Sequence, residues 1–388
     1  MRPGIRIPGT TLEDTLRNPT RRTVYSGLAI VAVGILLAGC AAAPEEDTGT
    51  GGAAEPTSDF LPCMVSDTGG FDDKSFNQLG FEGLQAGAEA VGSDYTEVES
   101  NTDADYAPNL DNLAAEGCNL IVTVGFNLAA ATVEAATANP DIDYSIIDDV
   151  ADTDFDGTTD AENIKPIVFD TAQAAFLAGC AAASWSTSGI VGTFGGMNFP
   201  TVSVFMDGFA QGVAYHNEQK GTDVKVLGWD TAAQDGTFIG GFEPGTDALA
   251  AANNLLDQGA DVLLPVGGPI YQSAGEAINA AMTANPDRKI AMIGVDADLY
   301  ESDPTYSAQY LTSILKGIDV AVADVVEASG NDSFDNTPFL GTLENDAVGI
   351  APFHDYEGEV SDTLQAELDE IKAGIIAGEI TVASYLAG

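Results

Sequence analysis

Short apolar runs alternate with helical patterns along most of this 388-residue chain. Runs rich in Val, Ile and Leu cover 119–124 and 144–148, and such runs are typical of strands buried on both faces of a parallel sheet. Helical patterns lie between and before them, at 79–91, 108–116 and 129–138. This alternation predicts an α/β fold in which doubly wound, mainly parallel sheets are flanked by helices.

The alternation continues in the second half of the chain. The expected elements there are helices at 172–184, 202–215 and 247–258 and strands at 189–194, 225–229, 262–266 and 290–295. A further helix is expected to start within 311–316 and to end near Ala328.

One stretch of the first half resembles a later one. Residues 113–125 read LAAEGCNLIVTVG, and residues 255–267 read LLDQGADVLLPVG. Each is the end of a helix, a glycine suited to a helix C-cap, a buried strand and a glycine at the end of that strand. Two similar α/β lobes would explain the likeness, although any two helix-strand units share much of this pattern.

The chain therefore divides into a leader, a linker and two lobes. The expected parts are a signal peptide at 1–39, a tether at 40–60, a first lobe at 61–168 with a return segment at about 296–330, and a second lobe at 169–295 with a C-terminal segment at about 331–388.

The N-terminal segment has the features of a targeting signal. Arg17, Arg21 and Arg22 precede an apolar run at 24–37, and the run closes in the sequence LAGC, which ends at Cys40. This order resembles a bacterial lipobox, which implies cleavage before Cys40 and lipid on its sulfur. The alternative is a plain membrane anchor with an incidental cysteine.

The charge of the chain restricts its partners. It has 60 acidic and 13 basic residues, for a net charge of −47. Nucleic acid and anionic membrane surfaces are repelled by such a field, so we expect no nucleic-acid partner and membrane contact through the lipid anchor alone. Solubility, including in a saline medium, is the plainer explanation of the acidity.

The sequence offers little to catalysis. The two histidines, His216 and His354, have no metal-ligand or nucleophile spacing, and P-loop and dinucleotide fingerprints are missing. We expect no cofactor, no metal and no enzymatic activity.

A glycine pair and several polar residues follow the first apolar run, which ends at Val65. Residues 67–77 read DTGGFDDKSFN. Phe76 offers a flat apolar face beside the hydrogen-bonding groups of Asp67 and Asn77, which suits a planar polar ligand. The alternative is an ordinary strand-to-helix connection in which Ser75 or Asp73 caps the helix.

Other candidate residues lie at the ends of predicted strands, where open α/β sheets bind ligands. They are Phe126 and Asp148 in the first lobe, Met197, Phe242 and Gly268 in the second, and Asp296 and Lys316 near the crossing. Lys316 interrupts an apolar segment and would pair with a carboxylate such as Asp296, unless it is a lysine on a helix surface.

The motif at 67–77 closely resembles the BMP (basic membrane protein) family. The fragments at 121–126, 176–179, 195–197, 259–262, 294–296 and 311–313 follow in the order of that family. Its members are substrate-binding lipoproteins of ABC importers, and many bind purine nucleosides. The resemblance extends from about residue 61 to the end of the chain.

The resemblance implies roles for particular residues. A nucleoside base would stack between Phe76 and Phe242, with Phe238 as the alternative second ring. The implied polar contacts are Asn77 and Asp148 to the base edge, Asp67, Asp296 and Lys316 to the ribose, and Gly268 through close backbone approach. The segment 267–271, GGPIY, departs from the small residues common in the family and puts the ligand in question.

The expected protein is thus a monomeric, two-lobed, type I periplasmic-binding-protein-like lipoprotein on the extracytoplasmic face of the cell membrane. It would close on a nucleoside and deliver it to ABC permease subunits. The alternatives are binding of another small polar metabolite such as a sugar, a receptor without transport, and an extracellular nucleoside or glycosyl hydrolase that uses Asp72 or Asp148.

Three cysteines follow the lipobox. Cys63 opens the first strand, and Cys118 precedes the strand at 119–124. These strands are neighbours if the second predicted strand, near residues 95–100, lies outside them, as is usual in doubly wound sheets. We therefore predict a Cys63–Cys118 disulfide and a buried Cys180 on a helix.

Overall fold

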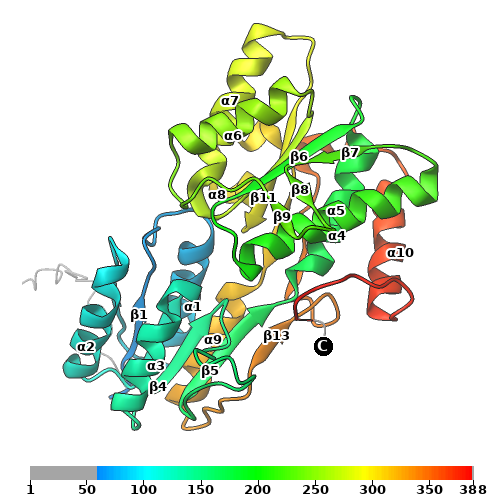
Figure 1. The fold of residues 1–388 in the computed structure, drawn as a ribbon. Coiled ribbons are helices and arrows are strands. Elements are labelled where there is room, and N and C mark those ends of the chain that lie inside the picture. The colour runs from blue at the N-terminus through cyan, green and yellow to red at the C-terminus, as the bar shows by residue number, and fades with distance from the viewer. Residues whose placement is uncertain (1–58, 387–388) are drawn as a thin grey trace, which may run out of the picture. The chain divides into compact units, whose positions relative to one another are not determined.

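The structure is a computed structural model of the chain, and it describes residues 59–386. The predicted signal peptide, the lipobox cysteine Cys40 and nearly all of the predicted tether lie outside these residues. Two six-stranded sheets, with helices around them, form the described part (Figure 1).

The first sheet is parallel throughout and has the strand order β13-β5-β4-β3-β1-β2. Its strands are β1 (Pro62–Val65), β2 (Thr96–Val98), β3 (Leu120–Val124), β4 (Asp143–Ile147), β5 (Ile164–Phe169) and β13 (Phe339–Gly341). β1 lies between β2 and β3, as the predicted disulfide requires.

The second sheet has the order β14-β12-β11-β10-β6-β7, and only its edge strand β14 is antiparallel. Its strands are β6 (Ile190–Gly195), β7 (Lys225–Leu227), β10 (Val262–Val266), β11 (Ala291–Asp296), β12 (Tyr310–Lys316) and β14 (Val348–Ile350). A separate two-stranded ribbon joins β8 (Trp229–Asp230) to β9 (Asp235–Gly236).

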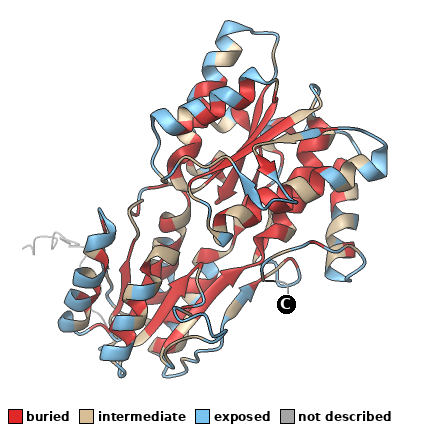
Figure 2. Ribbon diagram, in the orientation of Figure 1, coloured by how far each residue is buried: buried red, intermediate tan, exposed pale blue. Residues whose placement is uncertain are grey.

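Helices cover the sheets and are buried on the sides that face them (Figure 2). They are α1 (Phe76–Val91), α2 (Tyr106–Glu116), α3 (Ala129–Ala138), α4 (Thr171–Trp185), α5 (Pro200–Lys220), α6 (Thr246–Asp257), α7 (Tyr271–Ala284), α8 (Leu299–Ser302), α9 (Ile318–Gly330) and α10 (Leu364–Ile376). Short 3-10 helices occupy Asp103–Asp105, Phe126–Leu128, Gly268–Ile270, Ser307–Gln309 and His354–Tyr356.

Two helix pairs pack unusually closely because glycines lie at the contacts. A Cβ atom on Gly83 of α1 would lie 2.4 Å from the backbone oxygen of Asp319 in α9. A Cβ atom on Gly212 of α5 would lie 2.0 Å from the backbone oxygen of Phe176 in α4. Any larger residue at either glycine would force its helix away from its partner.

The chain passes between the two sheets three times. It leaves the first sheet after β5, returns after β12 through α9 to β13, and crosses again to reach β14. The two sheets are thus the centres of two lobes joined by three connections, which is the arrangement of a type I periplasmic-binding-protein-like fold.

The two sheets correspond strand by strand. β3 is third from the β2 edge of the first sheet, and β10 is third from the β7 edge of the second. These two strands are the ones in the repeated sequence pattern at 113–125 and 255–267. The likeness therefore reflects equivalent positions in two similar lobes.

The structure corrects one predicted element. Residues 311–316 do not start a helix, because they belong to strand β12, and α9 begins only at Ile318. The run is buried beside β11 and pairs with it in parallel. Its β-branched residues suit that central place in a sheet better than a helix.

The later part of the chain is also distributed differently from the expected division. β12, which falls in the expected return to the first lobe, lies in the second sheet. β13, which falls in the segment expected in the second lobe, extends the first sheet. Short edge strands such as β13 and β14 carry too few apolar residues to be recognised in the sequence.

Cys63 and Cys118 form a disulfide with a Cα–Cα distance of 5.9 Å. Cys180 is a free, buried thiol in α4. Because Cys63 lies in β1 and Cys118 just before β3, the disulfide lies near the amino-terminal ends of these strands, away from their carboxyl ends.

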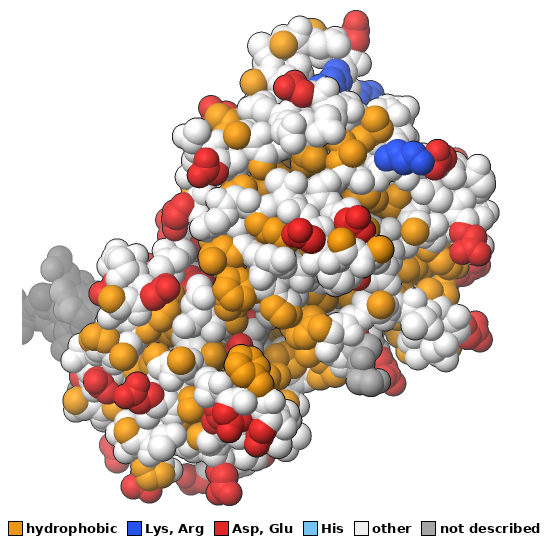
Figure 3. Space-filling model, viewed as in Figure 1, with side chains coloured by type: hydrophobic (Ala, Val, Ile, Leu, Met, Phe, Trp, Pro, Cys, Tyr) orange, Lys and Arg blue, Asp and Glu red, His pale blue; other side chains and the backbone are white. Residues whose placement is uncertain are grey.

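Acidic side chains are scattered over the face shown in Figure 3, whereas lysines and arginines are few there. Within residues 59–386, no helix combines the length and the apolar character needed to cross a bilayer.

Candidate functional site

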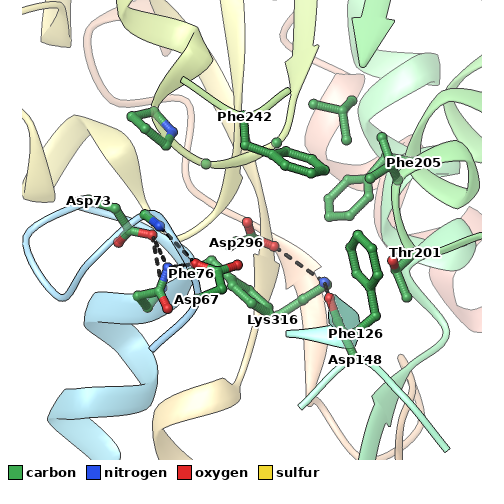
Figure 4. A pocket seen from close by; sticks show the side chains of 17 residues that line it. Asp67, Asp73, Phe76, Phe126, Asp148, Thr201, Phe205, Phe242, Asp296 and Lys316 are labelled. Carbon is green, nitrogen blue, oxygen red and sulfur yellow. Dashed lines mark hydrogen bonds and ion pairs between the residues drawn. The ribbon is translucent and has the colours of Figure 1, made fainter. Parts of the chain in front are cut away.

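A pocket lies between the two sheets, where the carboxyl ends of several of their strands meet (Figure 4). Its lining includes all eight residues to which the resemblance assigns ligand contacts: Asp67, Phe76, Asn77, Asp148, Phe242, Gly268, Asp296 and Lys316. These residues come from segments as far apart in the sequence as β1 and β12.

Two aromatic rings lie on opposite sides of the pocket. Phe76 opens α1, and Phe242 lies in the loop before α6 (Figure 4). Phe242 packs closely against two glycines, since a Cβ atom on Gly196 would lie 2.4 Å from its ring and one on Gly267 would lie 2.6 Å away. Phe238, the alternative ring, does not line the pocket and packs against Trp229 instead.

Further rings close one side of the pocket. Phe126, also anticipated as a cleft residue, has its centroid 6.2 Å from that of Phe242 and 4.3 Å from that of Phe199. Met197, the other anticipated residue, does not line the pocket. The walls therefore combine aromatic faces with charged groups.

The motif at 67–77 is both a helix cap and a pocket wall. The Asp73 carboxylate accepts hydrogen bonds from the backbone N–H groups of Ser75, Asn77 and Gln78 at the start of α1. Asp73 is therefore the cap. Ser75 is not, because its hydroxyl donates to the backbone oxygen of Val295 across the cleft, at 2.9 Å.

Asn77 links two carboxylates. Its Nδ2 donates to Asp67 Oδ1 at 2.8 Å and to Asp73 Oδ2 at 3.1 Å. Asp67 Oδ1 also accepts from the Gly69 N–H at 2.9 Å. Desolvation in the pocket wall raises the pKa of Asp67 to about 6, although these hydrogen bonds oppose the shift.

Lys316 is the last residue of β12 and is buried in the pocket. Its Nζ lies 2.6 Å from Asp148 Oδ2 and 3.4 Å from Asp296 Oδ1. The predicted pairing with Asp296 is thus present, but Asp148 is the nearer partner. Burial alone would lower the pKa of Lys316, but the two carboxylates outweigh it and the pKa is raised.

Lys316 also lies against aromatic rings. Its Nζ is 5.3 Å from the ring centroid of Phe76 and 5.0 Å from that of Phe205. Such contacts stabilise a desolvated ammonium group. Among the described residues that line the pocket, Lys316 alone is basic, and four are acidic.

Asp148 and Asp296 occupy equivalent positions in the two lobes. Asp148 follows β4 directly, and Asp296 ends β11, the strand at the matching place in the second sheet. Both have left-handed backbones, with φ values of 63° and 66°. Such strain in a non-glycine residue is typical of functional sites. Burial raises the pKa of Asp296 to about 6, partly offset by Lys316.

Several lining residues were not anticipated as ligand contacts. They are Gly69, Asp73, Thr201, Val202, Phe205, Val266, Gly267 and Pro269. Those on α5 had no signal in the sequence, because apolar residues at the start of a helix predict packing in the core. Gly267 had a signal in the sequence, because it directly follows a predicted strand, at the end where open α/β sheets bind ligands.

Tyr271, in the unusual segment at 267–271, does not line the pocket. It is fully buried, and its hydroxyl donates to Asp303 Oδ2 at 2.9 Å. Only Gly267, Gly268 and Pro269 of that segment reach the pocket.

Elsewhere in the described part, the carboxylates of Asp152, Asp154 and Asp156 lie within 4.8 Å of one another. They belong to a largely exposed loop after β4 and do not line the pocket.

A pocket of this composition, enclosed by two α/β lobes, defines a binding protein for a small molecule. The particular family follows from comparison: the chain belongs to the Bmp family, described as "ABC transporter substrate-binding protein PnrA-like", whose model matches residues 60–384. Proteins of this class bind small-molecule ligands and pair with permease subunits.

Relatives support this assignment. The chain is 28% identical over 375 residues to the "CD4+ T-cell-stimulating antigen" of Listeria monocytogenes, covering 93% of this chain and 98% of that protein. It is also 28% identical over 378 residues to the "ABC transporter nucleoside-binding protein BmpA" of Lactococcus lactis, covering 94% and 99%.

A solved ABC transporter solute-binding protein from Aeropyrum pernix has the same fold, with a TM-score of 0.73 at 24% identity over 84% of this chain and 94% of that one.

Proposed function

We propose that this chain is the nucleoside-binding lipoprotein of an ABC importer, with a purine nucleoside as its ligand. The observation that carries the proposal is the pair of rings Phe76 and Phe242 on opposite sides of a pocket rich in buried carboxylates (Figure 4). A planar base fits between two rings, and stacking contributes about 1–3 kcal/mol per base in single-strand binders.

The polar groups suit the rest of a nucleoside. Carboxylates accept hydrogen bonds from ribose hydroxyls and from base N–H groups, and Asp67, Asp148 and Asp296 all line the pocket. The name of the Lactococcus lactis relative as a nucleoside-binding protein points the same way.

The binding step is closure of two lobes around the ligand. Phe76 and Asp67 come from the first lobe, whereas Phe242 and Asp296 come from the second, so a bound nucleoside contacts both. Contacts made to both lobes at once stabilise the closed state relative to the open one. A permease that recognises the closed state then receives only the loaded protein.

Location follows from the lipobox. Lipid on Cys40 would hold the globular part on the extracytoplasmic face of the membrane, where the importer takes up its substrate.

Thermal unfolding with candidate ligands tests this function. A ligand that binds only the folded protein stabilises it according to its concentration relative to Kd. Inosine and guanosine should raise the unfolding temperature, whereas ribose or a free base alone should raise it less. Recovery of unchanged inosine after incubation would support binding, and release of free base would instead indicate a hydrolase.

A further inference from the structure

Three side chains of the pocket wall form a chain of hydrogen bonds from Asp73 through Asn77 to Asp67 (Figure 4). Both amide N–H groups of Asn77 are used, one toward each carboxylate. This fixes the orientation of the amide, because exchanging its nitrogen and oxygen would place an oxygen against two carboxylate oxygens.

Asp73 anchors one end of this chain. Its Oδ1 accepts from the N–H groups of Ser75 at 2.9 Å and Gln78 at 3.1 Å, and its Oδ2 accepts from the N–H of Asn77 at 2.9 Å as well as from the Asn77 amide. A carboxylate accepts about four hydrogen bonds. Asp73, only 3% exposed, is therefore fully used within the protein.

Asp67 lies at the other end and is used only in part. The bonds from Asn77 Nδ2 and the Gly69 N–H both go to Oδ1. Neither uses Oδ2, and Figure 4 shows the Asp67 side chain directed into the pocket.

Glycines leave the space that this arrangement needs. A Cβ atom on Gly69 would lie 2.8 Å from Asn77 Nδ2, and one on Gly125 would lie 3.0 Å from Asp67 Oδ2. Larger residues at these positions would displace the amide or the free carboxylate oxygen.

We propose that Asp73 and Asn77 are positioning residues, which hold Asp67 in the one orientation that presents its Oδ2 to the ligand. The inference rests on the proposed function and deepens it. This role comes in addition to the direct contact with the base that the family resemblance implies, for which the Oδ1 of Asn77 has no partner within the protein. Asp73 has no free acceptor for a ligand and acts only through Asn77.

The ionisation of Asp67 provides a readout of this role. An ionised Asp67 accepts hydrogen bonds from a ligand, so affinity should fall on acidification. Asp296 lines the same pocket and also has a pKa raised to about 6, so the shift of the midpoint in a variant, and not its position in the wild type, reports on Asp67. Burial raises the pKa of Asp67, the donors Gly69 and Asn77 lower it, and the charges of Asp73 and Glu243 raise it. The phenol of Tyr106 also faces Asp67.

Loss of the Asn77 donor should therefore raise the pKa of Asp67 further and move the midpoint to higher pH. A side chain that only contacted the ligand would change the affinity at every pH without moving the midpoint.

The experiment is calorimetric titration of the full chain with inosine from about pH 5 to pH 8.5, in the wild type and three variants. Asn77→Ala removes the amide but leaves the backbone bonds to Asp73 in place, so α1 keeps its cap. Asp73→Asn removes the anchor. Asp72→Asn is the matched control, because it makes the same chemical change on the neighbouring side chain, which is 88% exposed.

Weaker binding by about 10-fold at pH 7.5 in Asn77→Ala and Asp73→Asn, with the midpoint moved up by about one unit in Asn77→Ala, would support the proposal if Asp72→Asn changes neither. No upward shift is expected in Asp73→Asn, because that variant also removes a charge that raises the pKa of Asp67. Weaker binding with an unmoved midpoint would overturn it and leave Asn77 with direct contact alone. Unchanged binding would also overturn it. If Asp73→Asn fails to fold, Asn77→Ala decides alone.

Failure of the proposed function remains distinguishable. If the wild type binds no nucleoside, that function is wrong, and the positioning role is then decided without ligand by carboxyl ¹³C NMR titration of Asp67. A raised pKa of Asp67 in Asn77→Ala supports positioning, and an unchanged pKa overturns it.

Discussion

Lys316 Nζ lies 2.6 Å from Asp148 Oδ2, and this ion pair joins the last residue of a second-lobe strand to the strand end of the first lobe. Both side chains are buried, with 3% and 9% of their surfaces exposed. Asp296, at the equivalent strand end of the second lobe, is the second partner. One lysine thus balances two carboxylates that the two lobes contribute symmetrically.

Replacing this lysine should destabilise the protein strongly. Lys316→Met leaves Asp148 and Asp296 buried without a counter-charge, and breaking a buried pair costs about 3–5 kcal/mol. Urea unfolding at pH 7.5 measures the loss. Lys289→Met is the matched control, since Lys289 pairs with Glu359 at the surface with side chains 65% and 43% exposed. That pair should contribute no more than about 1 kcal/mol. Equal losses in both variants would contradict the account.

The buried Asp296 should give stability an unusual pH dependence. Burial raises its folded pKa from 3.8 to about 6, so between these values the folded protein holds a proton that the unfolded chain has lost. The unfolding free energy should therefore fall as pH rises from about 4 to about 6, by up to about 3 kcal/mol from this group. Asp296→Asn should remove that fall.

Asp335→Asn is the control for this pH dependence, with the opposite sign. Hydrogen bonds from Thr337 and the ion pair with Lys165 lower the pKa of Asp335. Its contribution to stability should therefore grow as pH rises through the acidic range. Urea unfolding at several pH values measures the contributions of Asp296 and Asp335 separately. If the unfolding free energies of Asp296→Asn and the wild type change with pH in parallel, the role of Asp296 is refuted.

The aromatic pair should decide nucleoside affinity. Phe76→Ala and Phe242→Ala each remove one stacking face, which should weaken binding by about 5- to 150-fold. Phe238→Ala removes a ring from the same loop as Phe242, but that ring packs on Trp229 outside the pocket lining. Calorimetry should find its affinity unchanged. A loss as large as that of Phe242→Ala would show that the second ring was misidentified.

The disulfide should affect stability without affecting binding. It closes a loop with a sequence separation of 55, for which chain entropy gives about 4 kcal/mol. The double variant Cys63→Ser/Cys118→Ser should lose about that much unfolding free energy and keep its nucleoside affinity, because the disulfide lies away from the pocket. Thiol titration of the denatured, unreduced residues 59–386 should find one thiol, from Cys180, and three would argue against the bond.

Much of the fold could be predicted because buried parallel strands are continuous apolar runs. β3, β10 and β11 were recognisable in this way, and the repeated pattern around β3 and β10 indicated two lobes. β12 was mistaken for a helix start, because its apolar residues Leu311, Ile314 and Leu315 have helical spacing and do not alternate as in a half-buried strand. β5 was missed because Lys165 and Pro166 interrupt its apolar residues.

Site residues were predictable where they lie in a sequence motif or at the end of an apolar run, and not elsewhere. Phe76 and Asn77 lie in a compact motif after the first strand, and Asp148 and Asp296 end apolar runs. Phe205 lies in α5, whose apolar residues all suit the core, so nothing in the sequence marks it as a pocket residue. It lines the pocket because α5 approaches the cleft. Asp73 and Ser75 were both candidates for the cap of α1 in the sequence, and only the backbone geometry of the helix start distinguishes them.

The most direct test of the account is calorimetric titration of the protein after unfolding and refolding to remove carried-over ligand. The titrants are guanosine, inosine, adenosine, uridine, cytidine, ribose and inosine 5′-monophosphate. The account predicts saturable binding of purine nucleosides and much weaker binding of the monophosphate, whose charge the carboxylates of the pocket repel. Tight binding of ribose alone would contradict it, and so would the absence of binding by every nucleoside.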